Sequence, residues 1–295
     1  MAATEAAETT ETTETTETTG DTATAATPTH RRPSPLSRLG RAPWWKVLVV
    51  FAALIGLWYA AAKHYADKGL PYLVPYPHDV FHAMFLDSTT RHDLVVALWR
   101  STEVALTGLA IAIVIGMAWA VLMAQAKWIE QSLYPYAVIL QCIPILALVP
   151  LIGALAGYEF KSRVIVTVMI SLFPMVSNTL FGLQATDQGQ RELFQLQGAR
   201  AWTRLAKLQI PAALPSIFVG LRIAAGLSVI GSIVGDQFFQ RGTPGLGVLI
   251  QVDASRLLGP EMYAAILTAS LLGVAVFLLF GLLGKLAIGR WYSFR

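Results

Sequence analysis

Two histidines in the hydrophilic stretch 63–95 have the best spacing in the chain for binding a metal ion. His78 and His82 lie one helical turn apart, so both imidazoles would share one face of a helix. The nearby aspartates add no third ligand at a fixed spacing. We therefore expect no metal site. We predict instead a solvated helix on the outer face of a membrane, with Phe81 and Phe85 against lipid.

Three polar side chains interrupt long apolar runs and are candidates for contact with a solute. They are Gln141, Asn178 and Asp236. A polar group inside a membrane is costly and therefore often functional, so we predict that these residues line a substrate pathway. Hydrogen bonds between helices are the alternative for the two amides. For Asp236 the alternative is that it holds a neighbouring helix.

Several kinds of catalytic and ligand-binding motif are missing from the sequence. There is no G-x-x-x-x-G-K-[ST] phosphate loop, no paired nucleophile and base, and no series of carboxylates in the apolar runs of the kind that proton-coupled carriers use. No aromatic-basic or zinc-finger pattern indicates nucleic acid binding. We expect a chain that is not an enzyme, needs no cofactor and binds no nucleic acid. The single cysteine, Cys142, is expected to be a buried structural thiol.

The elements that must position these residues are membrane helices. The chain is 55% hydrophobic and 14% charged, against about 25% charged in soluble domains. A membrane span needs about 20 mostly apolar residues, and six runs come close enough to predict an all-α integral membrane protein. The runs are roughly Val47–Ala62, Val104–Ala124, Leu133–Ala156, Val164–Leu183, Leu214–Val234 and Met262–Ile288.

Lys and Arg are concentrated before the first run, after the sixth, and in the segments that follow the second and the fourth. With six spans, all these segments fall on one side, which the positive-inside rule makes cytoplasmic. The opposite loops also hold bases, among them Lys63, Lys68 and Arg91, but fewer of them. We predict a multi-pass protein of the bacterial plasma membrane with both termini in the cytoplasm.

Prolines predict bent helices in the third and fourth runs. Pro135, Pro144 and Pro150 lie in the third run and Pro174 lies in the fourth. An interior proline removes a backbone hydrogen bond and kinks a helix. The freed carbonyl is tolerated where it faces protein or a water-filled cavity. Helices three to five are therefore candidate walls of a translocation path, with simple helix packing as the alternative.

Residues 1–40 form a segment of distinct composition. The repeat ETTETTETTETT occupies Glu8–Thr19, and six of the 18 acidic residues lie in positions 1–30, which contain no Lys or Arg. With almost no bulky apolar residues, such a segment cannot offset its ordering entropy. We predict a disordered cytoplasmic tail over residues 1–40 and a membrane domain over residues 41–295.

The basic segment between the fourth and fifth runs has the pattern of a helix pair. Apolar or small residues recur there at spacings of three and four, at Phe194, Gly198, Ala201 or Trp202, Leu205 and Leu208. Gly198 is placed to end one short helix and start another. We predict two short helices on the cytoplasmic surface. Their apolar side would enter a groove on a soluble partner, while basic residues stay in water.

This loop resembles the cytoplasmic signature of binding-protein-dependent ABC importer permeases, E-A-A-x-x-x-G followed by nine residues and I-x-L-P. Glu192, Gly198 and Pro211 stand at the family's spacing, although Leu193 and Phe194 replace the two alanines. The segments VPYPHDV, IPILALVPL, FPMVSNTLFGL, PAALPSIFVGLRIAAG and GLG continue the match in register. The resemblance covers about residues 70–290 and points to the nitrate/sulfonate/taurine branch, in which Asp236 replaces a common Glu.

The resemblance implies that the loop is a coupling helix that docks onto a cytoplasmic ATPase subunit. It further implies several partners: two such ATPase subunits, a second permease copy, an extracytoplasmic solute-binding protein and membrane lipid. The coupling residues it assigns are Glu192, Phe194, Gly198, Arg200, Trp202, Arg204, Leu208 and Pro211.

For the solute, the resemblance implies import of a compound of the nitrate, sulfonate or taurine type. Permeases for pyrimidine precursors of thiamine and for riboflavin-like compounds share the same pattern, so a heterocyclic solute is the alternative. An ion-coupled carrier or channel is the rival from another class. That rival predicts internal repeats and buried charges near the middle of the membrane, and the sequence shows neither pattern.

Overall fold

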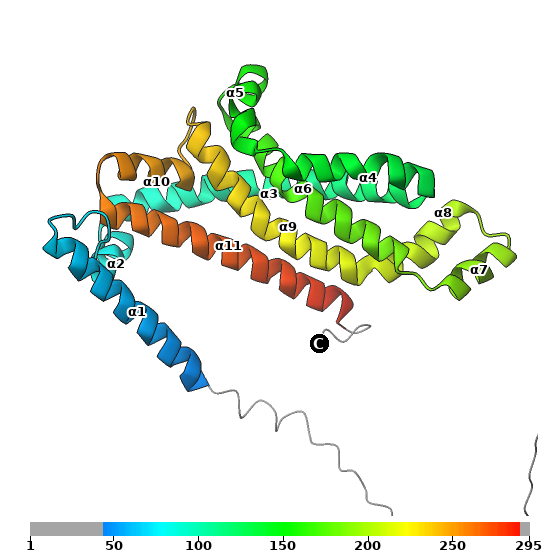
Figure 1. The fold of residues 1–295 in the computed structure, drawn as a ribbon, viewed down its shortest axis with the longest axis horizontal. Helices are drawn as coiled ribbons and strands as arrows, with labels where there is room; N and C mark the ends of the chain where they lie inside the picture. Colours follow the sequence, from blue (N-terminus) through cyan, green and yellow to red (C-terminus); the bar gives the residue numbers. More distant parts are fainter. Residues whose placement is uncertain (1–43, 290–295) are drawn as a thin grey trace, which may run out of the picture. The chain divides into compact units, whose positions relative to one another are not determined.

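The computed structural model describes residues 44–289 (Figure 1). The tail predicted over residues 1–40 therefore lies outside the described residues. Contacts divide the chain into a unit that ends at Val50 and a unit that begins at Phe51. The described part of the first unit is the start of helix α1 (Trp44–Asp67). The helix packing and the sites described below all lie within the second unit.

Residues 44–289 form helices joined by short connections, and no strand occurs among them. Five helical stretches are long and apolar enough to span a membrane, and the number is six if the bent pair of α4 and α5 counts as one span. The all-α membrane fold expected from the sequence is confirmed. After α1 the elements are α2 (Pro77–Phe85), α3 (Ser88–Ala124), α4 (Lys127–Cys142), α5 (Ile145–Ala156), α6 (Phe160–Gln184), α7 (Gln188–Leu196), α8 (Ala201–Arg204), a π-helical segment (Leu205–Gln209), α9 (Ile210–Phe238), α10 (Leu246–Ser255) and α11 (Gly259–Ile288).

The third predicted span is not one kinked helix but two helices, α4 and α5, which meet at an angle of 96°. The break falls at Ile143 and Pro144, both in extended conformations. A residue before proline is pushed out of the helical region, which explains why the chain opens at this point. The break also leaves Cys142 at the end of α4, where it is exposed and not buried as the sequence suggested.

Helix α3 begins at Ser88, well before the predicted start of the second span at Val104. The cause is a local cap: the Asp87 carboxylate accepts hydrogen bonds from the backbone N–H groups of Thr89 and Thr90 and from the Thr90 hydroxyl. Hydrogen bonds to its charged form, that from the Thr90 hydroxyl above all, hold the pKa of the Asp87 carboxyl below its ordinary value. The predicted outer loop 63–95 thus contains both α2 and the first turns of α3.

Helix α9 packs against α6 at positions where a side chain would not fit. A Cβ on Gly231 would lie 2.8 Å from the Thr167 Cα of α6, and one on Gly220 would lie 2.6 Å from the Asn178 Cβ. Such contacts require glycine, because a real Cβ cannot approach so closely. The main core cluster includes small residues such as Ala224 and Ala225 of α9. Close approach through small residues is a common way for membrane helices to associate.

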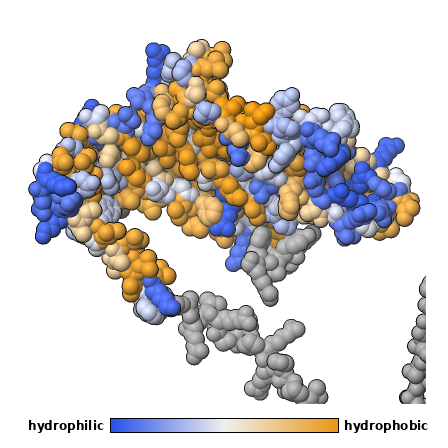
Figure 2. Space-filling view, viewed as in Figure 1, coloured by the Kyte–Doolittle hydropathy of each residue, from blue (hydrophilic) through white to orange (hydrophobic). Residues whose placement is uncertain are grey.

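Hydrophobic side chains cover much of the outer surface of the long helices (Figure 2). Hydrophilic residues gather near α7 and α8 at one end of the helices, and near the connection between α1 and α2 at the other end (Figures 1 and 2). An apolar band between two polar ends matches the bilayer, which has no water in its hydrocarbon region.

Candidate functional site

The loop between α6 and α9 forms two short helices that turn at Gly198, as the sequence predicted. Asp187 caps the start of helix α7, because its side chain accepts a hydrogen bond from the Gln190 N–H. It ends where the Gly198 N–H donates to the Gln195 carbonyl. Gly198 has φ +67°, and a Cβ added to it would have no atom within 4 Å. Glycine is therefore needed for its backbone conformation and not for space.

The apolar residues that this loop exposes differ from those predicted. The exposed side chains are Leu193, Leu196 and Trp202, with fractional exposures of 53%, 87% and 74%. Leu205 is instead 1% exposed and belongs to the core cluster, and Phe194 is half-buried. One helical period cannot run through Gly198 because the turn there changes the direction of the chain. The single stripe drawn through Phe194 and Leu205 was therefore wrong.

The other assigned coupling residues are distributed over both exposed and half-buried positions. Glu192 and Arg200 are exposed, whereas Arg204, Leu208 and Pro211 are half-buried. Arg204 is one of the residues that line a cavity of about 390 Å³ between this loop and the connection from α3 to α4. The structure thus presents only part of the assigned set to a partner in solution.

Arg191 ties the loop to the end of the membrane helix before it. Its guanidinium Nη2 donates to the carbonyls of Leu183 and Gln184, at 3.2 and 2.8 Å. These carbonyls belong to the last turn of α6, where helix carbonyls lack partners within the helix. These two hydrogen bonds connect α7 directly to the end of α6. The sequence showed Arg191 only as one more base of the segment.

At the other end of α9, Asp236 lies in a buried network of polar side chains. Its carboxylate is 3.1 Å from the guanidinium of Arg163 on α6 and accepts a 2.6 Å hydrogen bond from the Ser101 hydroxyl of α3. Asp236 is 0% and Arg163 3% exposed. The Ser101 oxygen in turn accepts from the Leu246 N–H at the start of α10. The network joins four helices.

The same arginine caps the end of α9 and the turn that follows it. Arg163 donates to the carbonyls of Phe239, Arg241 and Thr243, at 2.8, 3.0 and 3.0 Å. A Cβ on Gly245 would meet the Asp236 carboxylate, so the chain passes directly over it. This explains the glycine at the start of the GLG segment. The segment from 239 to 246 is thus fixed by side chains of α3, α6 and α9.

The three predicted pathway residues therefore do not form one site. Asp236 is fully buried in this structure, and its contacts with Arg163 and Ser101 support the alternative, that it holds neighbouring helices; its place in a pathway stays a prediction. Asn178 donates to the Pro174 carbonyl within α6 and faces Gly220 of α9, a packing position. Gln141 is exposed on α4, one turn before the break. Of the three, Gln141 keeps the most accessible side chain.

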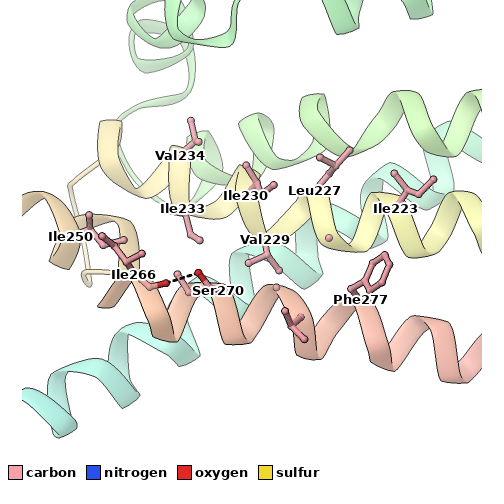
Figure 3. Close-up of a pocket in the computed structure, with 14 residues that line it drawn as sticks. Ile223, Leu227, Val229, Ile230, Ile233, Val234, Ile250, Ile266, Ser270 and Phe277 are labelled. Carbon is pink, nitrogen blue, oxygen red and sulfur yellow. Dashed lines mark hydrogen bonds between the residues drawn. The ribbon is translucent and has the colours of Figure 1, made fainter. Parts of the chain in front are cut away.

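A groove of about 700 Å³ runs between α9 and α11, and it is apolar (Figure 3). Ser270 is its only hydroxyl, and that hydroxyl donates to the Ile266 carbonyl of its own helix. The groove therefore offers no free polar group to orient a polar solute. The residues that line it are Ile223, Gly226, Leu227, Val229, Ile230, Ile233, Val234, Ile250, Ile266, Ala269, Ser270, Gly273, Val274 and Phe277.

No group of three or more potential metal ligands occurs among residues 44–289. His78 lies 3.5 Å from Asp79 at an exposed position, and Tyr59 stacks on the His78 ring. On the other side of α2, Val80 and Ala83 pack into the core cluster. Helix α2 thus combines a polar, aromatic face with a packed one.

Comparison with known proteins agrees with this architecture. The family described as "Binding-protein-dependent transport system inner membrane component" matches residues 112–290. The formylaminopyrimidine transport permease protein ThiX of Halalkalibacterium halodurans is 34% identical over 227 residues, which cover 77% of this chain and 88% of that protein. The riboflavin transport system permease protein RibX of Chloroflexus aurantiacus is 33% identical over 168 residues, 57% of this chain and 62% of that protein.

The nitrate import permease protein NrtB of Synechocystis is 26% identical over 195 residues, which cover 66% of this chain and 70% of that protein. Proteins of this kind are the membrane subunits of importers, and ATP hydrolysis and solute capture belong to separate ATPase and binding-protein subunits. The family match and the apolar helices agree in placing the protein in a membrane. The chain belongs to the binding-protein-dependent inner membrane components, the permease subunits of ABC importers.

Proposed function

We propose that the loop α7–α8 is the surface through which the ATPase subunit drives this permease. The observation that carries the proposal is the exposure of Leu193, Leu196 and Trp202 around a turn that only glycine adopts easily. Large apolar side chains in water are unfavourable and often mark an interaction site. Glu192 and Arg200, both exposed, would form the polar rim, and the half-buried Phe194 would support the turn from within.

In this proposal two copies of the chain pair in the membrane, and each binds one ATPase subunit at its α7–α8 loop. Both termini and this loop lie in the cytoplasm, as the distribution of basic residues favours. Closure of the ATPases on ATP would push the two loops and turn the path from inward-open to outward-open, a rigid-body switch between two states. The binding protein would deliver solute to the opposite side, where α2 and the segment 239–246 lie.

For the transported compound, we propose a nitrogen heterocycle of pyrimidine or flavin type. Sequence identity favours it, at 34% to the formylaminopyrimidine permease and 33% to the riboflavin permease, against 26% to the nitrate permease of Synechocystis. The second candidate is the nitrate, sulfonate or taurine class, because the aliphatic sulfonate permease SsuC of Escherichia coli is 30% identical over 162 residues.

The docking proposal is tested by co-purification of the ATPase subunit with substituted permeases. Trp202→Ala and Leu196→Ala should each reduce the amount of ATPase retained, because each removes a large exposed apolar side chain. Trp99→Ala is the matched control, since Trp99 is 69% exposed but lies on α3. Equal retention by the Trp202 and Trp99 variants, with both correctly inserted, would refute the docking surface.

Orientation and solute require separate measurements. A single cysteine at Gln197, in a chain whose Cys142 is replaced, should react with a membrane-impermeant maleimide only after the cytoplasmic face is opened. Labelling in intact cells would contradict the proposed topology.

For the solute, pyrimidines or flavins should compete with uptake by the assembled importer. Competition by nitrate or sulfonates alone would favour the second candidate.

A further inference from the structure

Arg222 is a charged residue within the spanning helix α9, and its side chain lies across α11. Its guanidinium carbon sits 3.9 Å from the centre of the Phe277 ring. A Cβ on Gly281 would be 3.2 Å from the Arg222 Nε, so the arginine occupies the space above that glycine. Arg222 is nevertheless exposed. The cation is therefore held in place on the surface of the helix pair.

Within residues 44–289, Arg222 has no carboxylate at ion-pair distance, nor does its side chain donate a hydrogen bond to a protein acceptor. The cation–π contact with Phe277 is worth only about 0.5–2 kcal/mol and neutralises no charge. An arginine in a membrane helix is costly unless it finds an anion or reaches the polar interface. The described part of the chain supplies no anion at Arg222, so an anionic group bound from outside would neutralise its charge.

The position of Arg222 places that group near one surface of the membrane. Gly281 lies seven residues before the end of α11, about 10 Å along its axis. Lys285 is one turn further on, on the same face as Gly281. Arg222 and Lys285 both line a cavity of about 230 Å³ that contains no acidic side chain. The two cations thus converge at the end of the helices nearest the α7–α8 loop, because α9 begins there.

The apolar groove of Figure 3 begins where this basic cavity ends. Phe277 lines the groove and also carries the Arg222 guanidinium on its ring. The groove then follows α9 and α11 toward α10, with Ile250 among its lining residues. Its single hydroxyl, on Ser270, is already bonded to its own helix. A charged pocket that continues into an uncharged groove along two spanning helices matches an amphiphile with an anionic head.

We propose that Arg222 and Lys285 bind the phosphate of an anionic phospholipid whose acyl chain lies in the α9–α11 groove. The two cations supply the charge that such a headgroup needs, and basic pockets between membrane helices bind anionic headgroups in this way. The arginine donates to phosphate oxygens through its planar fork, while the lysine acts as a point charge. The lipid neutralises Arg222 and holds α11 against α9. The proposal is independent of which solute the importer carries.

The headgroup is tested by native mass spectrometry of the full-length permease in complex with its ATPase subunits. Phosphatidylglycerol should bind, and phosphatidylcholine of the same chain length should bind more weakly. Arg222→Gln and Lys285→Gln should each weaken phosphatidylglycerol binding roughly fivefold, the change expected when one base near an anionic surface is neutralised. Arg256→Gln, at an exposed base of the opposite end, should change nothing. Arg222→Lys should retain most of the binding.

The acyl chain is tested by filling the groove. A Cβ on Gly273 would be 3.9 Å from its nearest neighbour, Val229, an ordinary contact distance. Because Gly273 lines the groove, the leucine of Gly273→Leu would occupy groove volume. This variant should weaken binding of dioleoyl phosphatidylglycerol and leave the dihexanoyl form unaffected. Equal loss of both would contradict the placement of the chain.

Three results would overturn the headgroup site. The first is binding of phosphatidylglycerol that is unchanged in both glutamine variants. The second is that inorganic phosphate raises the thermal unfolding temperature of the permease as much as phosphatidylglycerol does, which would indicate a site for a free anion. The third is a complex that carries no lipid while Gly273→Leu separates two permease copies, which would assign the groove to the second copy. If Arg222→Gln does not fold, Lys285→Gln and Arg222→Lys still decide the question.

Discussion

Removal of either member of the Arg163–Asp236 pair should strongly destabilise the end of the helix bundle that lies away from the α7–α8 loop. Both side chains are almost fully buried, and the pair is 3.1 Å apart. Loss of one partner leaves an uncompensated buried charge, which costs about 3–5 kcal/mol. Arg163→Met should be worse than Asp236→Asn, because the arginine also donates to three backbone carbonyls. An asparagine can still accept from Ser101.

The double variant Arg163→Met with Asp236→Leu gives the sharper test. Replacement of a whole buried pair by apolar side chains is often nearly neutral, so this variant should be more stable than Arg163→Met alone. The positive coupling in the double-mutant cycle isolates the charge interaction. The carbonyls of residues 239–243 still lose their donors, so stability should not return fully to that of the parent.

The measurement is thermal unfolding of the purified permease in lipid nanodiscs, with amide exchange at Leu246 as a local probe. Arg241→Met is the control, since Arg241 lies in the same segment but is exposed. Exchange at Leu246 should rise in the single variants because its N–H donates to Ser101, which Asp236 positions. Single variants as stable as the Arg241 control would refute the reasoning, as would a double variant less stable than both singles.

Three further outcomes are expected. Gly198→Ala should reduce the solute transported per ATP hydrolysed, because a left-handed backbone at residue 198 costs a non-glycine residue about 1–2 kcal/mol. Gly189→Ala should leave this ratio unchanged, and equal ratios in the two variants would contradict the reasoning. Gly231→Ala should push α9 from α6 and cost about 1–3 kcal/mol in thermal unfolding, while Gly273→Ala, with 3.9 Å of room, should be tolerated. Asp87→Ala should speed amide exchange in the first turn of α3 and Asp87→Asn much less, because the cap needs only a side-chain acceptor; equal exchange in both would exclude the cap.

The membrane spans were predictable because each one contacts the hydrocarbon region of the bilayer and therefore needs a long apolar run that is visible in the sequence. The predicted run Val164–Leu183 falls within α6, and Met262–Ile288 falls within α11, with differences of only a few residues at each end. The break in the third run was less predictable. Three prolines lie in that run, and only at Pro144 do two consecutive residues leave the helical conformation. Pro135 and Pro150 remain inside helices α4 and α5.

The site was predicted in part, for a similar reason. The turn at Gly198 follows from one residue's backbone freedom, which is a local property. The role of Asp236 depends on Arg163, which lies 73 positions earlier and joins it only through the packing of α6 on α9. The signal was available: an arginine at the edge of an apolar run is as costly as the aspartate and implies a partner. Taken together, the two residues would have suggested an ion pair.

Helices α6 and α9 are held together by different contacts at their two ends, and these contacts limit how the two helices can move. At the loop end, Arg191 joins α7 to the last turn of α6, and Leu205 places the segment before α9 in the core. At the opposite end, Arg163 fastens the turn after α9 to α6. Between these ends, glycine contacts such as Gly231 leave no room for sliding. We therefore expect a force on the α7–α8 loop to move α6 and α9 together. Among the described residues no side-chain hydrogen bond crosses the bend between α4 and α5, so we expect the change in shape to be absorbed there.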